Sequence, residues 1–314
     1  MIKNKKILIT GLNSSISKKF ISFLEKTILN SVIYILTNKK KNNLNKKNTN
    51  IIFLKKQYTD LYKYKKIINN CDYFFHFAYQ NSEIFAQKNS LEDFKINVVG
   101  LNNILKETQN NKKLKFIFIS TASIYQTSNS NINEKSKIQI LSYYNLHKYY
   151  CENLIKFYSS FSKNKFIILR LSNVYGDFDL TKRDFLLNCI YKITKNRSVS
   201  IYGSGKYLRD FIHIDDVANA LIQIIKINIL HKFNTFNLCS GQSIKLIDLV
   251  KLIIKKNNKI GSRFVGKIKF SKNSSKLVKR NFLSNSNKFK KKFNWKAIVK
   301  LEDGISKLVK KFKD

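Results

Sequence analysis

The sequence predicts an α/β protein with a doubly wound parallel sheet and a smaller C-terminal α/β lobe. In the first half, short apolar runs rich in β-branched and aromatic residues alternate with longer amphipathic stretches. Continuous apolar strands separated by helices are typical of a parallel sheet that is covered on both faces. Beyond about residue 172 the alternation changes to helical stretches separated by short strands. We therefore expect one domain over residues 1–172 and a second lobe over residues 173–314, some of whose segments return to the first domain.

The individual elements follow from these patterns. Strands of the first domain are expected at Lys6–Thr10, Val32–Thr37, Ile51–Leu54, Tyr73–Ala78, Phe116–Ser120 and Phe166–Leu171, and helices at Ser17–Leu29, Leu91–Glu107 and Tyr143–Tyr158. The second lobe is expected to contain helices at Arg183–Asn196, Val217–Ile227, Ile247–Lys256 and Leu301–Lys311. Its short strands are expected near Val199–Tyr202, Phe233–Leu238 and Lys267–Phe270.

The composition allows a packed core and argues against a membrane protein. Of the 314 residues, 43% are hydrophobic and 13% are aromatic, which is too apolar for a mainly disordered chain. No apolar run reaches the roughly 18 residues that a transmembrane helix needs. The basic start is followed by a short apolar stretch, Ile7 to Thr10, which is too short for the core of a signal peptide. We therefore expect a cytoplasmic protein without a membrane partner.

The four cysteines give no sign of a metal site. They are widely separated, and none of them forms a Cys-x-x-Cys pair: Cys71, Cys151, Cys189 and Cys239. This spacing indicates reduced structural thiols, and we expect no metal cofactor.

The net charge of +41 allows two interpretations. It could mark a nucleic-acid or membrane-surface partner. The alternative is a biased composition, with no proline and only 9 glycines, in which lysines fill ordinary solvated positions. Because the lysines are spread along the chain, we favour the second interpretation and expect no specific nucleic-acid partner. The positive field would still favour anionic ligands, of which a nucleotide diphosphate is one.

The first apolar strand runs into a turn that can hold a phosphate group. The segment from Thr10 to Ser17 reads Thr-Gly-Leu-Asn-Ser-Ser-Ile-Ser and leads into a helix. Such a turn at the carboxyl end of a strand places helix amides and the positive end of the helix dipole against a pyrophosphate. The candidate cofactor contacts in this turn are Gly11, Asn13, Ser14, Ser15 and Ile16.

Tyr144 and Lys148 form a candidate catalytic pair. Their spacing puts both side chains on one face of a helix. An ammonium group beside a phenol favours the phenolate, so we expect Lys148 to lower the pKa of Tyr144 from its usual value of about 10. The phenol could then act as acid or base at a substrate hydroxyl or carbonyl. Thr121 is the candidate for a third group that binds the same oxygen, and His147 is expected at the surface, facing away from the pair.

The order of these motifs resembles the extended short-chain dehydrogenase/reductase family of NAD-dependent epimerases and dehydratases. A strand is followed by Ser-Thr-Ala-Ser-Ile-Tyr over residues 120–125, then by the Tyr-x-x-x-Lys pair and Glu152. Further segments resemble the family's motifs: His76-Phe-Ala78, Asn97-Val-Val-Gly100, Arg170 to Gly176 and Ile201 to Val217. The resemblance covers nearly the entire chain. It implies a Rossmann domain with an attached substrate lobe, an NAD(P) cofactor and nucleotide-sugar chemistry.

The cofactor contacts that the resemblance implies have drifted in this chain. The family's phosphate turn is Thr-Gly-x-x-Gly-x-x-Gly, and Ser14 and Ser17 stand at its second and third glycines. Thr37 stands where the family has the aspartate that binds the ribose hydroxyls of NAD, and lysines follow at positions 39 and 40. A missing carboxylate beside cations suits a 2′-phosphate, so NADP is favoured over NAD. The other implied cofactor contacts are Gln57, Ala78, Asn97, Tyr144 and Lys148.

The resemblance also implies residues that bind a nucleotide-diphosphate sugar. Asn173 matches an asparagine that contacts the substrate diphosphate. Arg209 lies in the segment most specific to the family, where a guanidinium group can grip a pyrophosphate through two hydrogen bonds. The alternative for Arg209 and Asp210 is a local structural ion pair. The remaining substrate candidates are Ser123, Tyr202 and Arg280.

Missing residues narrow the reaction. Nucleotide-sugar 4,6-dehydratases carry an Asp-Glu pair directly after the catalytic threonine, where this chain has Ala122 and Ser123. Two chemistries remain: a 4-epimerase that works through a transient 4-keto sugar, similar to UDP-glucose 4-epimerase, and an NADPH-dependent 4-ketoreductase. A non-catalytic nucleotide-binding relative is a third interpretation, motivated by the serines in the phosphate turn. A helix-to-helix homodimer is common in the family and is therefore a candidate assembly.

Overall fold

The computed structural model describes residues 1–37, 44–46, 49–55, 58–127, 131–176, 184–227, 231–261, 263–271 and 281–313. Two predicted contact residues, Gln57 and Arg280, lie outside these ranges. The chain forms two compact units. The first unit comprises Met1–Ile124, Ile138–Leu171 and Ala218–Phe236, and the second comprises Tyr125–Lys137, Ser172–Val217 and Asn237–Asp314.

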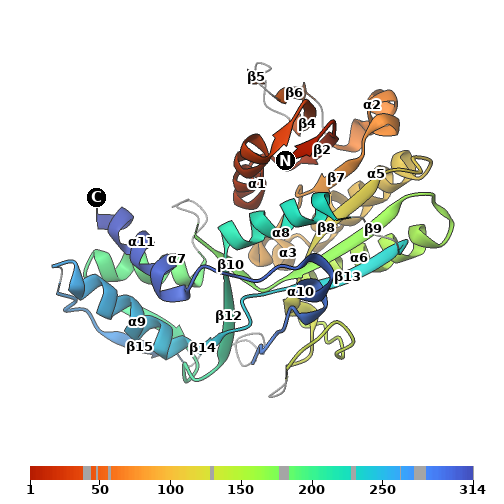
Figure 1. The fold of residues 1–314 in the computed structure, drawn as a ribbon. Coiled ribbons are helices and arrows are strands. Elements are labelled where there is room, and N and C mark those ends of the chain that lie inside the picture. Colours follow the sequence, from red (N-terminus) through yellow and green to blue (C-terminus); the bar gives the residue numbers. More distant parts are fainter. Residues whose placement is uncertain are drawn as a thin grey trace. The chain divides into compact units, whose positions relative to one another are not determined.

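The first unit is built on a large sheet (Figure 1). Its strand order is β13 (Phe233–Leu238), β9 (Lys165–Leu171), β8 (Lys115–Thr121), β7 (Tyr73–His76), β2 (Lys6–Thr10), β4 (Ser31–Thr37), β6 (Thr49–Lys55) and β5 (Leu44–Lys46). Pairing is parallel from β9 through to β6, and β5 is antiparallel to β6 at the edge. This confirms the predicted Rossmann-type sheet. The chain runs outward from β2 to β6 and then returns to β7, so the carboxyl ends of β2 and β7 meet at the switch point where such sheets bind ligands.

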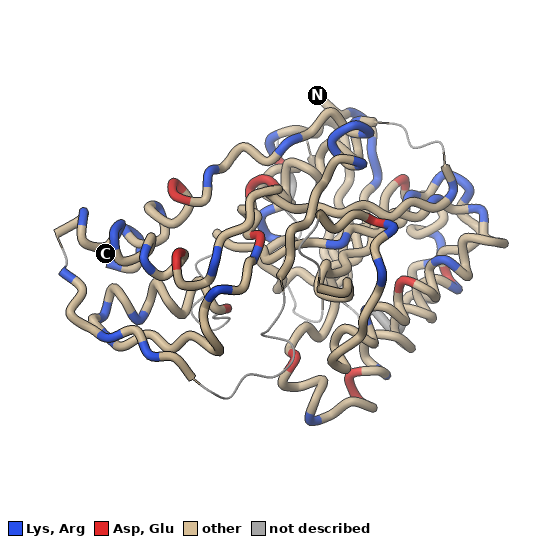
Figure 2. Tube along the Cα trace, turned by 90° about the horizontal axis from the view of Figure 1, so that it is seen from below, with Lys and Arg blue, Asp and Glu red and all other residues tan. Residues whose placement is uncertain are grey.

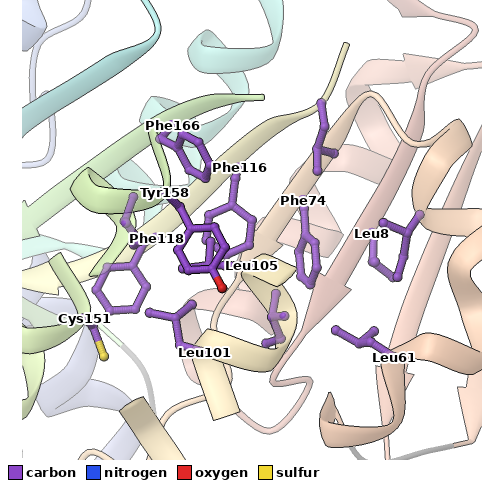
Figure 3. Packing of buried hydrophobic residues seen from close by; sticks show 14 of the residues in the cluster. Leu8, Leu61, Phe74, Leu101, Leu105, Phe116, Phe118, Cys151, Tyr158 and Phe166 are labelled. Carbon is purple, nitrogen blue, oxygen red and sulfur yellow. The ribbon is translucent and has the colours of Figure 1, made fainter. Parts of the chain in front are cut away.

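Helices cover both faces of this sheet (Figure 1). On one face lie α1 (Ser15–Thr27) and α8 (Ile214–Lys226): the ring centroids of Phe20 and Phe75 are 4.4 Å apart, and the Tyr73 hydroxyl donates to the Ile225 carbonyl. On the other face lie α2 (Lys65–Asn70), α5 (Gly100–Thr108) and α6 (Tyr143–Phe161), packed on a cluster that includes Phe74 (Figure 3). Neighbouring residues of a strand therefore pack against helices on opposite faces of the sheet, because side chains alternate in direction along a strand.

The helix expected over Leu91–Glu107 is divided in the structure. It consists of α4 (Ser90–Phe94), a π-helical turn η2 (Lys95–Val99) and α5, and it follows the short helix α3 (Glu83–Lys88). The π-helical turn contains Asn97, whose side chain bonds the main chain of Gln80. Turns of this kind are concentrated at functional sites, because the wider turn re-aims a side chain.

The second unit contains short strands and several helices. One small sheet has the order β10 (Asn173–Tyr175), β12 (Leu208–His213), β14 (Ser243–Lys245), and another pairs β11 (Val199–Tyr202) with β15 (Ile268–Ser271). Helices α7 (Phe185–Thr194), α9 (Leu246–Lys259) and α11 (Leu301–Lys313) pack on one another around a core that includes Leu186, Leu249 and Ile305. In the short helix α10 (Asn287–Phe293), the ring of Phe289 contacts both Phe293 and Trp295.

Lysine and arginine residues are distributed along the trace over many elements rather than confined to one (Figure 2). All four cysteines are buried and unpaired by disulfides. Within the described ranges, no group of three His, Cys, Asp or Glu side chains is arranged to hold a metal ion. No helix in the same ranges has the length and apolar character needed to cross a membrane.

Candidate active site

The predicted phosphate turn lies at the carboxyl end of β2. Gly11 has a φ of +78°, and a Cβ atom at this position would collide with the main chain of Phe77 and Ala78. Only glycine fits both the left-handed conformation and this close approach. The turn is therefore packed against the segment that follows β7, which places Gly11 beside Ala78, another predicted cofactor contact.

The two serines that replace glycines have different surroundings. Ser14 stands directly before α1 with a φ of −69°, which any residue adopts, and its hydroxyl caps no amide of this described helix. Ser17 is fully buried, and its hydroxyl has no hydrogen-bond partner in the described structure. The amides of the first turn of α1, from Ser15 to Ser17, therefore receive no side-chain cap from Ser14 and can bind an anion.

A buried polar contact joins the ends of β2 and β7. The Thr10 hydroxyl is 2.8 Å from Nδ1 of His76, and it accepts a hydrogen bond from the Ala78 amide at 3.3 Å. Burial, together with the nearby Lys148 ammonium, lowers the pKa of His76 to about 3, so its imidazole is neutral. The sequence motifs include both Thr10 and His76, but they gave no sign that the two side chains are in contact, because the residues lie on different strands.

Asn97 and Thr37, two further predicted cofactor contacts, differ in environment. The buried Asn97 side chain accepts from the Gln80 amide at 2.8 Å and donates to the Gln80 carbonyl at 3.1 Å. The Asn97 carbonyl accepts a bond from the Cys151 thiol of α6. Asn97 thus braces the loop after β7 against α6. Thr37 ends β4 and is half-buried. Direct cofactor contacts of both residues stay predictions.

Thr121 and Tyr144 are brought together as the sequence predicted. Their hydroxyl groups are hydrogen-bonded, and Thr121 Oγ1 also lies 2.9 Å from Ser123 Oγ. Ser123 in turn donates to the side-chain carbonyl of Asn145 at 2.7 Å, while the Asn145 amide donates back to the Ser123 carbonyl at 3.1 Å. Asn145 is fully buried. Sequence analysis did not single it out, although its place directly after Tyr144 fixes the end of β8 to the start of α6.

The expected effect of Lys148 on Tyr144 is wrong for this structure. Burial and the carboxylate of Glu83 raise the pKa of Tyr144, the hydrogen bond with Thr121 lowers it, and Asp93 adds a smaller raising effect. The phenol is therefore protonated at neutral pH. The spacing of four residues correctly predicted that both side chains share one face of the helix. It could not predict that this face is buried away from water, which raises the pKa of the phenol.

Lys148 itself is almost fully buried, with 4% of its surface exposed. Its ammonium donates a 2.7 Å hydrogen bond to the Ile119 carbonyl and lies over the rings of Tyr79 and Phe118. Burial lowers the pKa of Lys148 to about 7, against the raising effect of Cys151, Glu152 and Asp93. A lysine held in this way is close to losing its charge at neutral pH.

His147 lies in the interior, so its predicted surface position is wrong. Its Nδ1 is 2.6 Å from a carboxylate oxygen of Asp93, and both side chains are buried. Helix α4, which carries Asp93, packs on this side of α6. Sequence reasoning missed this pair because the two residues belong to different helices.

A buried ion pair fixes α6 to the sheet. The guanidinium group of Arg170 binds both carboxylate oxygens of Glu152 at 2.6 to 3.1 Å, and the Ser120 hydroxyl donates to the same carboxylate. Glu152 and Arg170 are 4% and 8% exposed. These contacts join α6, which carries Tyr144 and Lys148, to strands β8 and β9.

The substrate candidates of the second unit lie around β10, β11 and β12. Asn173 is exposed, and its amide donates to the Asp210 carbonyl at 2.8 Å. The Asp210 carboxylate is buried and accepts bonds of 2.6 to 2.9 Å from Ser172, Ser240 and Gly241. Arg209 donates to the Leu208 carbonyl and lies over the Phe282 ring, and Tyr202 is 50% exposed. Asp210 therefore acts as an acceptor for neighbouring loops, which supports a role for Arg209 other than a simple ion pair with it.

Comparison with known proteins now adds to this geometry. Residues 7–239 match the model of the NAD dependent epimerase/dehydratase family. The chain belongs to this family. This confirms the resemblance expected from the motifs. A UDP-glucose 4-epimerase of Mycoplasma genitalium is 29% identical over 275 residues, which cover 79% of this chain and 81% of that protein.

Solved structures share the fold along almost the whole chain. The UDP-glucose 4-epimerase of Thermotoga maritima, solved with UDP-glucose, has a TM-score of 0.83 at 23% identity and covers 98% of both chains. The UDP-glucuronic acid 4-epimerase of Bacillus cereus, solved with UDP-glucuronic acid and NAD, has a TM-score of 0.83 at 20% identity, covering 98% of this chain and 99% of that one.

Proposed function

We propose that this protein is an NAD(P)-dependent enzyme that inverts C4 of a nucleotide-diphosphate sugar through a transient 4-keto form. The observation that carries the proposal is the hydrogen-bonded pair of Thr121 and Tyr144. It stands where β8 ends and α6 begins. The phosphate turn reaches the same edge of the sheet, because Gly11 packs against Ala78 and the next residue, Tyr79, contacts the ring of Tyr144.

The Gly11 turn fits the pyrophosphate of such a cofactor. A positive φ at Gly11 lets the chain turn sharply, and the uncapped amides at the start of α1 are free of competition from the Ser14 hydroxyl. An anion placed there would complete their hydrogen bonds. When bound, NAD(P) supplies the chemistry of hydride uptake from C4 and hydride return. Thr37, at the end of β4, offers no carboxylate to a ribose, which supports NADP over NAD.

We assign the proton transfer to Tyr144. Epimerisation requires its phenol to take the proton of the 4-hydroxyl group and later to return it to the 4-keto oxygen. Thr121 donates a second hydrogen bond to that oxygen, and Ser123 and Asn145 hold Thr121 in place. Because burial raises the pKa of Tyr144, removal of the proton needs a positive charge nearby, which Lys148 on the same helix face can supply.

A 4-ketoreductase is the second candidate, and the protonated state of Tyr144 favours it. A phenol with a raised pKa is ready to donate a proton to a ketone, whereas it must first be ionised to act as a base. In this reaction the cofactor would be consumed once per sugar. The same residues would act, with Thr121 and Tyr144 both binding the keto oxygen.

The second unit is proposed to bind the nucleotide diphosphate. Asn173, Tyr202 and Arg209 are the described candidates, with Ser123 near the sugar and Arg280 as a further phosphate contact. UDP is the favoured nucleotide, because the similar proteins named above act on or bind UDP-sugars. The net charge of +41 supports an anionic substrate without selecting a particular one.

One experiment separates the two reactions. The purified protein would be incubated with UDP-glucose, UDP-N-acetylglucosamine or UDP-glucuronic acid in the presence of NAD or NADP, and in a separate reaction with a 4-keto sugar nucleotide and NADPH. Products would be identified by proton NMR, and NADPH oxidation would be followed by absorbance. An epimerase forms the C4 epimer without net change in cofactor. A ketoreductase instead oxidises one NADPH per molecule of a 4-keto sugar nucleotide.

Variants of the proposed acid–base residue provide the control. Tyr144→Phe keeps the ring and removes the hydroxyl, and it should lower the rate by about 10²- to 10⁴-fold while cofactor binding remains. An unchanged rate in this variant would overturn the assignment of Tyr144. If neither cofactor binds at millimolar concentration, the enzymatic function itself is wrong and the non-catalytic interpretation takes its place.

A further inference from the structure

We infer that Tyr79 is a positioning residue for Lys148. The face of its ring holds the lysine ammonium in place, and the same ring contacts Tyr144. The catalytic meaning of this role rests on the proposed function, but the contacts themselves do not. Tyr79 follows β7 and lies two residues after Phe77 in the segment that packs against the Gly11 turn. Neither the motifs nor their spacing indicate a role for it.

The ammonium of Lys148 has an unusual set of neighbours. Its Nζ lies 3.3 Å from the centre of the Tyr79 ring and 4.9 Å from the centre of the Phe118 ring. Within the part of the chain that the structure describes, its one hydrogen bond, of 2.7 Å, goes to the Ile119 carbonyl. Since the side chain is 4% exposed, water supplies little of the solvation that a charged amine needs. The electron-rich face of Tyr79 is therefore a major part of what stabilises the charge.

The same ring also contacts the proposed acid–base residue. The rings of Tyr79 and Tyr144 meet edge to face, with centroids 6.1 Å apart and planes at 89°. This is a favoured geometry for two aromatic rings. One side chain therefore has the ammonium on its face and the phenol of Tyr144 beside it, and it fixes the relative position of the two.

The Tyr79 hydroxyl does not take part in this arrangement. It is buried and has no hydrogen-bond partner among the residues that the structure describes. The role therefore belongs to the aromatic ring, which Phe also provides, and not to the phenol. This distinction gives a matched pair of substitutions: Tyr79→Phe keeps the ring face, whereas Tyr79→Leu removes it and keeps an apolar side chain.

Several titratable groups act on Lys148 besides the ring, and each is unchanged in these variants. They are Cys151 and Glu152 on α6, Asp93 on α4 and His76 on β7. Any difference between Tyr79→Phe and Tyr79→Leu therefore comes from the ring. Comparing the two variants cancels the effects of these neighbours.

The test is a titration of Lys148 in the cofactor-free protein. Protein labelled with ¹³C at the lysine ε-carbon would be followed by NMR from pH 5 to 11, and a Lys148→Met variant would identify the signal by its loss. Most lysines titrate near 10.4, so one that titrates near 7 stands apart. We expect Tyr79→Phe to leave this titration unchanged and Tyr79→Leu to move it lower by about one unit, a tenfold change in acidity.

A second readout connects the position to activity. In the cofactor-loaded enzyme, the pH profile of sugar conversion should keep its alkaline limb in Tyr79→Phe and shift it to lower pH in Tyr79→Leu. If Leu at this position prevents folding, Tyr79→Met provides a flexible apolar side chain without a ring face.

Two results would overturn the inference: equal Lys148 titrations in the Phe and Leu (or Met) variants, or a wild-type Lys148 that titrates with the other lysines. A merely structural role of Tyr79 would lower the melting temperature of the Leu variant and leave the titration where it is. Failure of the proposed function would show differently, as absence of sugar conversion in the wild-type protein, and would leave the NMR result standing.

Discussion

The buried pair of Glu152 and Arg170 allows a quantitative test of how the active-site helix is held. Glu152 lies one turn after Lys148 on α6, and Arg170 lies on β9, so their contact joins the helix to the sheet. Removal of one partner leaves the other charge buried without compensation, which costs about 3–5 kcal/mol. We therefore expect Glu152→Met to lower the free energy of unfolding of the first unit by that amount.

The double variant provides the decisive comparison. In Glu152→Met with Arg170→Met, neither charge remains, and apolar side chains of similar volume fill the space. Such replacements are often neutral or stabilising. The double variant should therefore recover most of the stability lost in Glu152→Met. Ser120→Ala, which removes a single hydrogen bond to the carboxylate, should cost about 1 kcal/mol.

Urea unfolding followed by circular dichroism measures these differences. Because the chain has two units, the slope of free energy against urea must first be shown to be the same in all variants. The reasoning is refuted if Glu152→Met costs less than about 1 kcal/mol, or if the double variant is as unstable as the single one. In the first case the pair is solvated in solution, and in the second the polar network itself is essential.

Three further predictions concern the cofactor turn, the response to pH and assembly. Gly11→Ala should weaken cofactor binding by at least tenfold in a fluorescence titration, because the strained φ costs about 1–2 kcal/mol and the new Cβ displaces the turn. Ser14→Gly is the control and should bind the cofactor at least as tightly as the wild-type protein. His76 is neutral in the folded protein, because its pKa is lowered to about 3 from an unfolded value of about 6.5. The free energy of unfolding should therefore fall as the pH drops from about 6.5 to about 3, by up to about 1.4 kcal/mol per pH unit. In urea titrations, His76→Asn should remove this part of the pH dependence. Tyr150 and Phe157 lie seven residues apart on α6 and are 44% and 63% exposed, which suits a self-complementary contact with a second copy of the chain. Sedimentation should therefore show a dimer, and Phe157→Lys should dissociate it. A monomeric wild-type protein would contradict this prediction.

The sequence was sufficient for the sheet and for the order of the site residues. Apolar runs at the right spacing gave β2, β4, β6, β7, β8 and β9, because parallel strands covered on both faces leave a periodicity that is easy to recognise. The Tyr-x-x-x-Lys spacing and the threonine at the end of β8 predicted the pair of Thr121 and Tyr144 for a similar reason. Both are local patterns whose geometry is fixed by one helix or one strand end.

The electrostatics of the site could not be predicted in the same way. The pKa of Tyr144 depends on burial and on Glu83, and the position of the Lys148 ammonium depends on Tyr79 and Ile119. These neighbours come from α3, from the loop after β7 and from β8. Contacts between separate elements leave no spacing in one sequence, so the sign of a pKa shift is not readable from it.

The phosphate turn shows how a structure separates essential from dispensable members of a motif. Gly11 is fixed by two independent requirements, a left-handed φ and main-chain contact with Phe77 and Ala78, and it is the glycine that this chain retains. Ser14 has an ordinary φ, and Ser17 needs only to be small enough for burial. The loss of the second and third glycines therefore leaves the fold of the turn intact. What Ser14 changes is the space and the hydrogen-bonding groups offered to the anion, which is a matter of affinity for the cofactor and not of folding.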